Sequence, residues 1–407
     1  MNDTCIIVGA SHAGIQLAIG LRQEGWQGRI LLLGEEACLP YHRPPLSKSY
    51  LKNEADLAII HPQASLDKHE IEFLASTRVV RIDRQVREVL LDNQQRLAYT
   101  KLALCTGASP RRLSIEGSDL QGVHYLRDHA DADRLRTQLP GARNVVIIGA
   151  GYIGLETAAS LRQLGLQVCV LEAAPRILGR SVDEPVSAFF EALHQDNGVT
   201  IRTSCQVSQL VGKEHVEAVL CTDGTHYPAD IVVIGVGVKA NVGLAEDAGL
   251  AVDDGILVDS SARTSDAEIV AAGDCTRFPS AHLQRLVRLE CLANASDQAR
   301  VAAATLCGHE RRHDALPWFW SDQYATRLQI AGVVDEYERV VQRGDIATGS
   351  FCRFYLRDAV VLSALCVNRP KEFIACKRLI ATARPVDPTK LADESCDINV
   401  ALSALPA

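Results

Sequence analysis

Aromatic residues are scarce in this chain: they make up 5% of its 407 residues, so its cores are expected to be aliphatic. An excess of basic residues is also lacking, because 42 lysines and arginines stand against 50 acidic residues and give a net charge of −8. A general nucleic-acid binder normally carries a basic stripe, so no nucleic-acid partner is expected. The remaining composition is that of an ordinary globular protein, and the length predicts several domains.

No hydrophobic run approaches the roughly 20 residues that a membrane-spanning helix needs. The longest run, at residues 231–238, is interrupted by Gly235 and Gly237. The first four residues lead directly into an apolar strand pattern, without the basic region of a signal peptide. We therefore expect a cytoplasmic protein that does not enter a membrane.

Cysteine is abundant, yet the spacing of the cysteines matches no metal or redox motif. The smallest separation among the 13 cysteines is the ten residues between Cys366 and Cys376. No Cys-x-x-Cys pair exists, so no metal site is expected, and most thiols are predicted to be reduced core residues. His309 and His313 flank two arginines, which predicts a surface turn and not a metal site.

The strongest pattern in the sequence is an internal repeat at a spacing of about 140 residues. Each copy consists of an apolar strand, a glycine-rich turn, a helix, a second strand and a final acid. Glycines let the backbone approach a pyrophosphate, while the helix offers it free N–H groups and a positive dipole end. The acid accepts hydrogen bonds from a ribose. Two such sites on one chain are typical of a flavoprotein that also uses a nicotinamide.

The first copy is predicted to bind FAD. Its turn and its acid are Gly9, Ser11, Ala13, Gly14 and Glu35. Ser11 replaces the middle glycine of the usual fingerprint. Serine is small, and its hydroxyl can donate a hydrogen bond to phosphate, so this copy is retained as the FAD site.

The second copy is predicted to bind NADH. Its turn and its acid are Gly149, Gly151, Ile153, Gly154 and Glu172. A carboxylate at Glu172 suits the free 2′-hydroxyl of NADH and repels the 2′-phosphate of NADPH. Arg176 and Arg180 lie nearby and could soften this preference, but NADH is the expected nucleotide.

Four further segments carry a family resemblance. They are YHRPPLSK at residues 41–48, CTGASP at 105–110, IVAAGDC at 269–275 and PWFWSDQ at 317–323. Along nearly its whole length the chain resembles the FAD-dependent pyridine-nucleotide oxidoreductases, specifically the ferredoxin reductases of bacterial oxygenase systems. The resemblance implies hydride transfer from NADH to FAD, then single electrons to a [2Fe–2S] ferredoxin on a separate chain that feeds a cytochrome P450 or Rieske oxygenase. A monomer or weak dimer is expected.

The resemblance also implies roles for single residues, and it requires no residue to act as an acid or base catalyst. Lys48 is expected beside the reactive flavin ring, Glu156 at the nicotinamide in reach of Lys48, and Trp320 on the flavin side that faces the iron–sulfur partner. Asp274 would bind the ribityl chain, and Arg127 would be a further FAD contact. The other expected cofactor contacts are Arg43, Thr106, Gly107 and Leu292 for FAD, and Arg180 and Gly237 for NAD.

Simpler structural roles stay open for several of these residues. Lys48 could be a solvated lysine before a helix, and Glu156 an acid favoured by the helix dipole. Arg127 could form a surface ion pair. Trp318 and Trp320 alternate as in a strand, so either could be a core residue.

Other activities also stay open. Disulfide reductases of the same superfamily carry a Cys-x4-Cys pair soon after the first turn, whereas this chain has only Cys38 there, so an internal dithiol is not expected. A single-cysteine peroxidase or NADH oxidase would need Cys38 against the flavin. The two remaining alternatives are a rubredoxin reductase and a redox-controlled signalling flavoprotein resembling apoptosis-inducing factor. The signalling class would carry a basic or partner-binding extension, which this acidic chain lacks.

The predicted fold class is α/β, with two Rossmann-like dinucleotide-binding domains for FAD and NAD and a C-terminal α+β domain. The FAD domain is assigned to residues 1–109 and 238–313, the NADH domain to 110–237 and the C-terminal domain to 314–407. Alternating segments that begin at Arg327, Arg339 and Ser350 predict an antiparallel sheet, and residues 371–382 predict a helix. The last twelve residues or so are expected to be loose.

An acidic ferredoxin would need a local basic surface on this acidic chain. The candidates lie just before the PWFWSDQ segment and in the C-terminal domain: Arg311, Arg312, Arg369, Lys371, Lys377 and Arg378.

Overall fold

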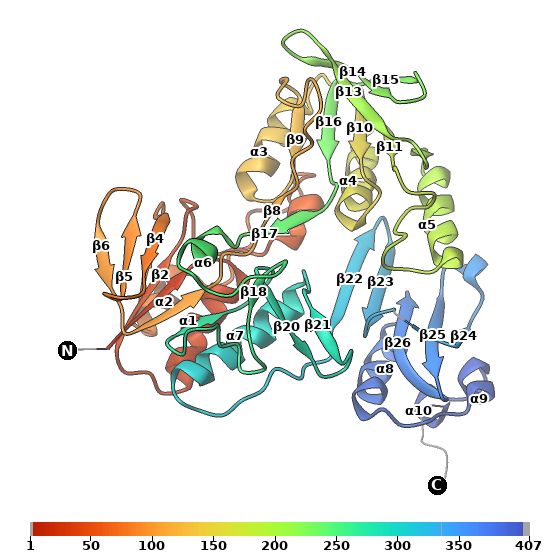
Figure 1. Ribbon diagram of the computed structural model, residues 1–407. Helices are drawn as coiled ribbons and strands as arrows, with labels where there is room; N and C mark the ends of the chain where they lie inside the picture. Colours follow the sequence, from red (N-terminus) through yellow and green to blue (C-terminus); the bar gives the residue numbers. More distant parts are fainter. Residues whose placement is uncertain (1–2, 335, 402–407) are drawn as a thin grey trace. The chain divides into compact units, whose positions relative to one another are not determined.

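The chain has a mixed α/β fold and divides into two compact units in this computed structural model, which describes residues 3–334 and 336–401 (Figure 1). Unit 1 holds the described residues up to His42 together with Leu57–Ser109 and Lys239–Pro317. Unit 2 holds Arg43–Asp56, Pro110–Val238 and the described residues from Trp318 onward.

Unit 1 is built on a parallel sheet of five strands in the order β19-β7-β1-β2-β3. These strands are β1 (Thr4–Val8), β2 (Arg29–Leu33), β3 (Ile71–Leu74), β7 (Lys101–Leu104) and β19 (Ile269–Ala271). They are apolar almost throughout because both faces of the sheet are covered. On one face α1 (His12–Gln23) packs against α7 (Leu292–Leu306), and small residues such as Gly20 and Ala303 let the two helices approach closely.

Smaller elements complete unit 1. One antiparallel sheet contains β4 (Val79–Asp83), β5 (Glu88–Leu91) and β6 (Arg96–Ala98). A second sheet contains β18 (Ile256–Leu257), β20 (Thr276–Ser280) and β21 (Arg285–Val287). Two short helices are α2 (Gln63–Lys68) and α6 (Gly243–Asp247). The pair β8 (Ala108–Pro110) and β17 (Val238–Ala240) lies where the chain passes from one unit to the other.

Unit 2 contains a second parallel sheet in the order β12-β11-β10-β16-β9. Its strands are β9 (Val123–Tyr125), β10 (Asn144–Ile148), β11 (Gln167–Leu171), β12 (Thr200–Arg202) and β16 (Ile231–Ile234). Its helices are α3 (His129–Gln138), α4 (Tyr152–Gln163) and α5 (Glu184–Asp196), preceded by the 3₁₀ turn η1 (Pro44–Ser47). A meander of β13 (Val207–Gly212), β14 (Val216–Cys221) and β15 (His226–Pro228) adjoins the sheet.

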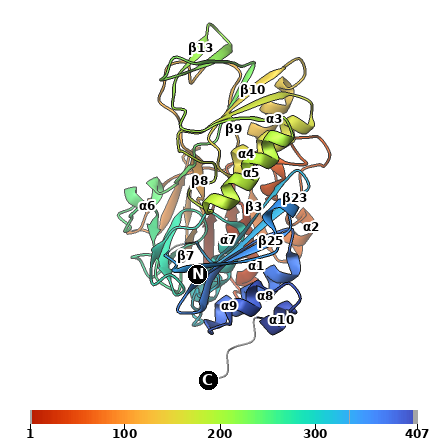
Figure 2. The ribbon, with the colours of Figure 1, turned by 90° about the vertical axis from the view of Figure 1, so that its right-hand side faces the viewer.

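The C-terminal part of unit 2 is an antiparallel sheet in the order β22-β23-β26-β25-β24. The strands are β22 (Trp318–Gln323), β23 (Thr326–Ala331), β24 (Arg339–Arg343), β25 (Phe351–Arg357) and β26 (Val360–Val367). The turn η2 (Ile346–Thr348) and the helices α8 (Pro370–Thr382), α9 (Pro388–Ala392) and α10 (Ile398–Ala401) accompany the sheet, and the three helices lie together in both ribbon views (Figures 1 and 2).

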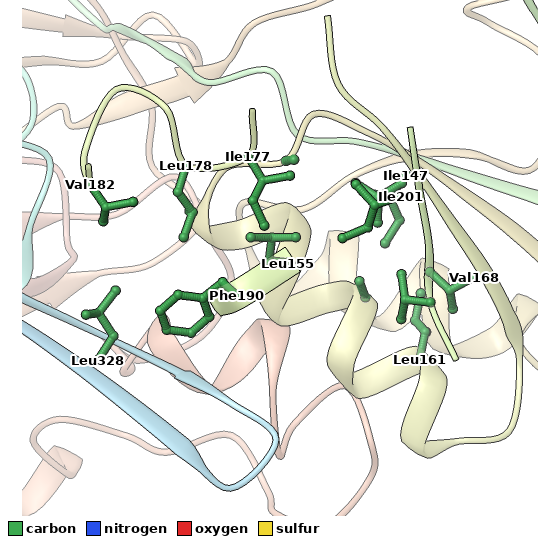
Figure 3. Close-up of a cluster of buried hydrophobic side chains, with 14 of the residues drawn as sticks. Ile147, Leu155, Leu161, Val168, Ile177, Leu178, Val182, Phe190, Ile201 and Leu328 are labelled. Carbon is green, nitrogen blue, oxygen red and sulfur yellow. The ribbon is translucent and has the colours of Figure 1, made fainter. Parts of the chain in front are cut away.

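One hydrophobic core joins this sheet to the second parallel sheet. Phe190 of α5 lies beside Leu328 of β23, and Leu155 of α4 lies in the same cluster (Figure 3). Phe351 and Tyr355, on β25, are fully buried in the same core. The C-terminal sheet is therefore held against α5 and against α4, the helix that begins at the glycine turn around Gly151.

The predicted C-terminal sheet and the helix at residues 371–382 are confirmed, and all 13 cysteines are free thiols. The surface turn expected at His313 is wrong: its side chain is buried with its ring 4.7 Å from that of Phe278, whereas His309 is exposed and pairs with Glu24. The loose C-terminus is wrong up to Ala401, because Ile398 and Ala401 are buried in α10; residues 402–407 lie outside the described part.

Within residues 3–334 and 336–401, no helix combines the length and the apolar character needed to cross a bilayer. The three-domain division stays a prediction, since the second parallel sheet and the C-terminal sheet belong to one compact unit.

Candidate functional site

The first candidate site lies at the carboxyl edge of the parallel sheet in unit 1. Strands β1, β2, β7 and β19 all run toward that edge, and Gly9, Glu35, Thr106 and Asp274 follow them directly or within a few residues. Ligands of open parallel sheets bind outside this edge. The structure therefore brings these four predicted residues to one edge.

Steric contacts explain the glycines of the first turn. Gly9 has φ +107°, and a Cβ atom there would lie 2.2 Å from the Cys105 carbonyl oxygen. A Cβ atom at Gly14 would lie 1.9 Å from the Gly9 carbonyl oxygen. Ser11 is the N-cap residue of α1, and its backbone is extended, with φ −126° and ψ −158°. An extended backbone is open to any residue, so serine is compatible with this turn in place of the middle glycine.

The other residues at this edge are fixed by hydrogen bonds inside unit 1. The Thr106 hydroxyl donates to the Asn241 carbonyl at 2.6 Å, and the Asn241 amide donates to the Thr106 carbonyl at 2.8 Å. The Gln298 amide oxygen accepts from the Gly273 N–H at 2.8 Å, just before the half-buried Asp274. Ala13 is buried in α1, Leu292 is the first residue of α7, and Gly107 has φ +65°.

The second candidate site is the corresponding turn in unit 2. Gly149 has φ +104°, and a Cβ atom there would lie 2.5 Å from the Gly235 carbonyl oxygen. A Cβ atom at Gly154 would lie 2.1 Å from the Gly149 carbonyl oxygen. At Gly151, the N-cap of α4, a Cβ atom would meet nothing within 4 Å. The turn therefore leaves a bare space over the helix start, which fits a pyrophosphate group.

Glu172 lies beside this turn. Its carboxylate accepts hydrogen bonds from the Ala150 N–H at 2.7 Å and the Ala174 N–H at 2.9 Å, so it is aimed at the glycine turn. Ile153 is 47% exposed on the first turn of α4. Gly237 has φ +98°, and a Cβ atom added there would lie 3.8 Å from a guanidinium nitrogen of the exposed Arg180. The structure therefore gathers the predicted NAD residues at one sheet edge.

A buried ion pair joins Lys48 and Glu156 within unit 2. The Lys48 ammonium contacts Glu156 Oε2, and its side chain is 20% exposed while that of Glu156 is 3% exposed. The Ser47 hydroxyl donates to the same oxygen at 2.6 Å, and the Ser321 hydroxyl donates to Oε1 at 2.7 Å. Lys48 is therefore not a solvated lysine. Glu156 is not only an acid near a helix start, because it also accepts bonds from Lys48, Ser47 and Ser321.

Three other predicted residues also lie in unit 2. Arg43 donates to the Arg127 carbonyl at 2.8 Å, and the Arg127 N–H donates to Asp131 at 3.0 Å. Trp320 is half-buried and stacks on Trp318 with ring centroids 5.5 Å apart. Of the predicted FAD contacts, Arg43, Lys48 and Arg127 thus belong to unit 2 and the others to unit 1.

Sequence reasoning missed several residues around Glu156. Ser47, Ser321, Gln323 and His194 are all buried and linked by hydrogen bonds to it or to one another. The sequence did contain one signal for them. Ser321 and Gln323 alternate in the PWFWSDQ segment with the apolar Phe319, and alternate residues of a strand share one face, so both could have been predicted to be buried together.

Comparisons with known proteins identify the family of the chain. Residues 3–303 match the pyridine nucleotide-disulphide oxidoreductase family model, and residues 318–402 match the reductase C-terminal model. The chain is 42% identical over 414 residues to putidaredoxin reductase of Pseudomonas putida, covering 100% of this chain and 98% of the relative. It is 40% identical over 405 residues to the anthranilate 1,2-dioxygenase system ferredoxin–NAD(+) reductase component of Burkholderia cepacia, covering 98% and 99%.

The chain is also similar to a solved structure and to a rubredoxin reductase. The covalent putidaredoxin reductase–putidaredoxin complex matches with a TM-score of 0.94 and 43% identity, covering 98% of this chain and 97% of that chain. A rubredoxin–NAD(+) reductase of Pseudomonas putida is 38% identical over a shorter span of 339 residues, which is 83% of this chain and 88% of the relative.

Proposed function

The chain belongs to the pyridine nucleotide-disulphide oxidoreductase family, and we propose that it is an NADH-dependent ferredoxin reductase of a bacterial oxygenase system. It takes FAD and NAD(H). The physiological acceptor is a [2Fe–2S] ferredoxin on a separate chain, which passes single electrons to a cytochrome P450 or Rieske oxygenase.

The observation that carries this proposal is the pair of equivalent glycine turns. In each, the first glycine lies against a backbone carbonyl of the neighbouring strand end, and the later glycine lies against the first. Each turn leads directly into a helix, whose N-cap residue is Ser11 in the first turn and Gly151 in the second. One chain therefore offers two pyrophosphate cradles, as an enzyme that couples a flavin to a nicotinamide requires.

The residues of unit 1 fit FAD. We assign the pyrophosphate to the turn of Gly9, Ser11, Ala13 and Gly14, a ribose to Glu35 and the ribityl chain to Asp274. Thr106, Gly107 and Leu292 lie at the same sheet edge or at a helix start of this unit. When bound, FAD supplies the conversion of a two-electron hydride donor into two single-electron transfers.

The residues of unit 2 fit NADH. We assign the pyrophosphate to Gly149, Gly151 and Gly154, and the adenine ribose to Glu172, with Ile153, Arg180 and Gly237 lining the approach. Glu156 lies in the second turn of the helix that starts at this turn, and we assign it to the nicotinamide. The Lys48 ammonium forms an ion pair with the buried Glu156 carboxylate, which offsets part of the cost of burying the carboxylate.

We also propose that the protein works in the cytoplasm. All 13 cysteines are free, and several are deeply buried; for example, desolvation raises the pKa of Cys105 well above its ordinary value. Free thiols in such numbers suit a reducing compartment.

Steady-state NADH oxidation with different acceptors tests the function. We expect fast turnover with a [2Fe–2S] ferredoxin and slower turnover with a rubredoxin. Preference for the rubredoxin would favour the rubredoxin-reductase alternative. Slow reoxidation by every acceptor would favour a redox-controlled signalling protein, and turnover with hydrogen peroxide or oxygen alone that a Cys38→Ser substitution abolishes would favour a peroxidase or oxidase.

Replacing Glu172 with glutamine is expected to weaken NADH binding and to narrow the preference for NADH over NADPH. The carboxylate makes charge-assisted hydrogen bonds, each of which contributes about 1.5–3 kcal/mol, or roughly ten- to a hundredfold in affinity. Dissociation constants for both nucleotides measure the effect. Unchanged selectivity would show that Glu172 does not read the ribose.

Charge reversal on α8 is expected to slow ferredoxin reduction and to flatten its salt dependence. Lys371 and Arg378 are exposed on this helix, and the Lys377 ammonium lies 4.5 Å from the Trp318 ring centroid. Arg369, by contrast, pairs with Glu372 and Glu394, and Arg311 in unit 1 pairs with Glu24. The double substitution Lys371→Glu with Arg378→Glu is therefore the sharper test, measured as ferredoxin reduction against ionic strength.

NADH-to-ferricyanide turnover is the control for this surface, because a small acceptor needs no docking. We expect it to be nearly intact in the α8 variant. Trp320→Ala should likewise impair ferredoxin reduction more than flavin reduction by NADH. If either variant loses both half-reactions equally, the electron exit is not at this face.

A further inference from the structure

The PWFWSDQ segment places two polar side chains, those of Ser321 and Gln323, in the protein interior. β22 lies against α4, where the rings of Phe319 and Tyr152 are 4.5 Å apart. Alternate residues of a strand share one face, so Ser321 and Gln323 lie on the same side as Phe319, and both are 0% exposed. Buried polar groups are costly unless they are hydrogen-bonded, so the bonds that these two side chains make need an explanation.

These bonds form a continuous chain that ends at Glu156. The Ser321 hydroxyl lies 2.7 Å from Glu156 Oε1, and Gln323 Nε2 lies 3.2 Å from the Ser321 hydroxyl. Gln323 Oε1 lies 2.8 Å from Nε2 of His194, a residue of α5 that is 0% exposed. The Tyr324 hydroxyl lies 3.3 Å from His194 Nδ1. All of these hydrogen-bonded residues belong to unit 2.

The carboxylate fixes the direction of every bond. An ionised carboxylate only accepts, so Ser321 must donate to it, and the lone pair of Ser321 then accepts from the Gln323 amide. The Gln323 carbonyl accepts in turn, which requires a proton on His194 Nε2. Nδ1 of a neutral His194 then accepts from the Tyr324 hydroxyl. All four donors therefore point toward Glu156.

The environments of the two outer groups support this direction. Burial lowers the pKa of His194, so the imidazole is neutral near pH 7. Burial raises the pKa of Tyr324 to about 12, so its hydroxyl keeps the proton that it donates. Aligned hydrogen bonds in a low-dielectric interior polarise and strengthen one another.

We propose that Ser321 and Gln323 are positioning residues for hydride transfer, because their aligned bonds hold Glu156 Oε1 and leave Oε2 to Lys48 and Ser47. This inference rests on the proposed placement of Glu156 at the nicotinamide. It also gives the polar half of PWFWSDQ a role distinct from that of its tryptophans. Gln323 acts only through Ser321, and His194 acts only by holding the Gln323 amide in one orientation.

The substitution Ser321→Ala tests this proposal most directly. It removes the hydroxyl that donates to Glu156 Oε1 and leaves the Lys48–Glu156 ion pair in place. We expect flavin reduction by saturating NADH to be about tenfold slower in stopped-flow experiments, with the NADH dissociation constant within about twofold of the parent value. Gln323→Met, which keeps the size of the side chain but removes its polar atoms, should show a smaller loss of the same kind.

Ser363→Ala is the matched control. Ser363 is also 0% exposed in the C-terminal sheet, but its hydroxyl makes no hydrogen bond to the described part of the chain. Its substitution should leave the rate of flavin reduction unchanged. An unchanged rate in Ser321→Ala, or an equal loss in Ser363→Ala, would overturn the positioning role.

A spectroscopic measurement on the parent protein tests the direction of these hydrogen bonds, and a variant is used only to assign the signal. ¹⁵N NMR of histidine-labelled protein should show His194 as the neutral tautomer with the proton on Nε2, its signal assigned by its loss in His194→Gln. A proton on Nδ1 instead would require the opposite direction for the hydrogen bond between His194 and Gln323, and it would contradict the proposal. Neither measurement uses ferredoxin, so a protein that fails to reduce ferredoxin would contradict the proposed function without deciding this inference.

Discussion

Glu156→Ala is expected to slow flavin reduction by NADH at least about a hundredfold, which corresponds to roughly 2.7 kcal/mol in the activation barrier. The substitution leaves the Lys48 ammonium without its carboxylate, and it leaves the hydroxyls of Ser47 and Ser321 without their acceptor. Breaking a buried ion pair from one side costs about 3–5 kcal/mol, and the 20% exposure of Lys48 places this pair near the lower value. The free energy of unfolding should therefore fall by about 3 kcal/mol, which denaturant titration measures.

Glu217→Ala provides the comparison. Glu217 is an exposed glutamate on β14 in the same unit, and surface substitutions usually change stability by less than about 0.5 kcal/mol. If Glu156→Ala behaves like Glu217→Ala in both stability and flavin reduction, the buried pair has neither of the roles assigned to it.

Gly9→Ala is expected to produce a colourless protein, whereas the parent protein should be yellow with one FAD per chain. The added methyl group would lie 2.2 Å from the Cys105 carbonyl oxygen at a φ of +107°, so the turn cannot keep its shape. Distortion of the turn moves the N–H groups that bind the pyrophosphate. Absorbance of the bound flavin per chain measures the loss.

Gly25→Ala is the matched substitution. Gly25 has a similar φ of +92°, but an added Cβ atom there would meet nothing within 4 Å. This variant should lose some stability from backbone strain and stay yellow. A Gly9→Ala protein that still carries one FAD per chain would show that the flavin does not bind at this turn.

The dinucleotide turns could be predicted from sequence because their requirements are local. Gly9 and Gly14 lie within one turn and the helix start that follows it, and their steric reason, contact with a nearby carbonyl, applies wherever a strand enters a helix this tightly. Glu172 could also be predicted, since a second strand after such a helix returns to the same sheet edge. Its hydrogen bond to Ala150 is a consequence of that topology.

The surroundings of Glu156 could not be predicted in the same way. Ser47 and Ser321 lie more than a hundred residues from Glu156 in the sequence, and only the packing of β22 on α4 brings Ser321 to the carboxylate. His194 lies on yet another element, α5. A periodic pattern shows that a position is buried, but it does not show which distant polar group that position meets.

The two wrong expectations have a common cause. His313 follows two arginines, and the local charge predicted exposure, but the ring of Phe278 provides a buried place for it. The residues around Ile398 were expected to be loose because of their terminal position, yet Ile398 and Ala401 are buried and α10 lies against α8 and α9. Position and local charge are weaker guides than tertiary packing.

An anaerobic titration with NADH tests the proposed function most directly. One equivalent of NADH, added to the FAD-loaded protein with excess oxidised [2Fe–2S] ferredoxin, should reduce two equivalents of ferredoxin, because a hydride carries two electrons and each cluster accepts one. The same addition without the protein should reduce almost none. A protein that oxidises NADH rapidly with ferricyanide but leaves the ferredoxin oxidised would contradict its assignment as a ferredoxin reductase.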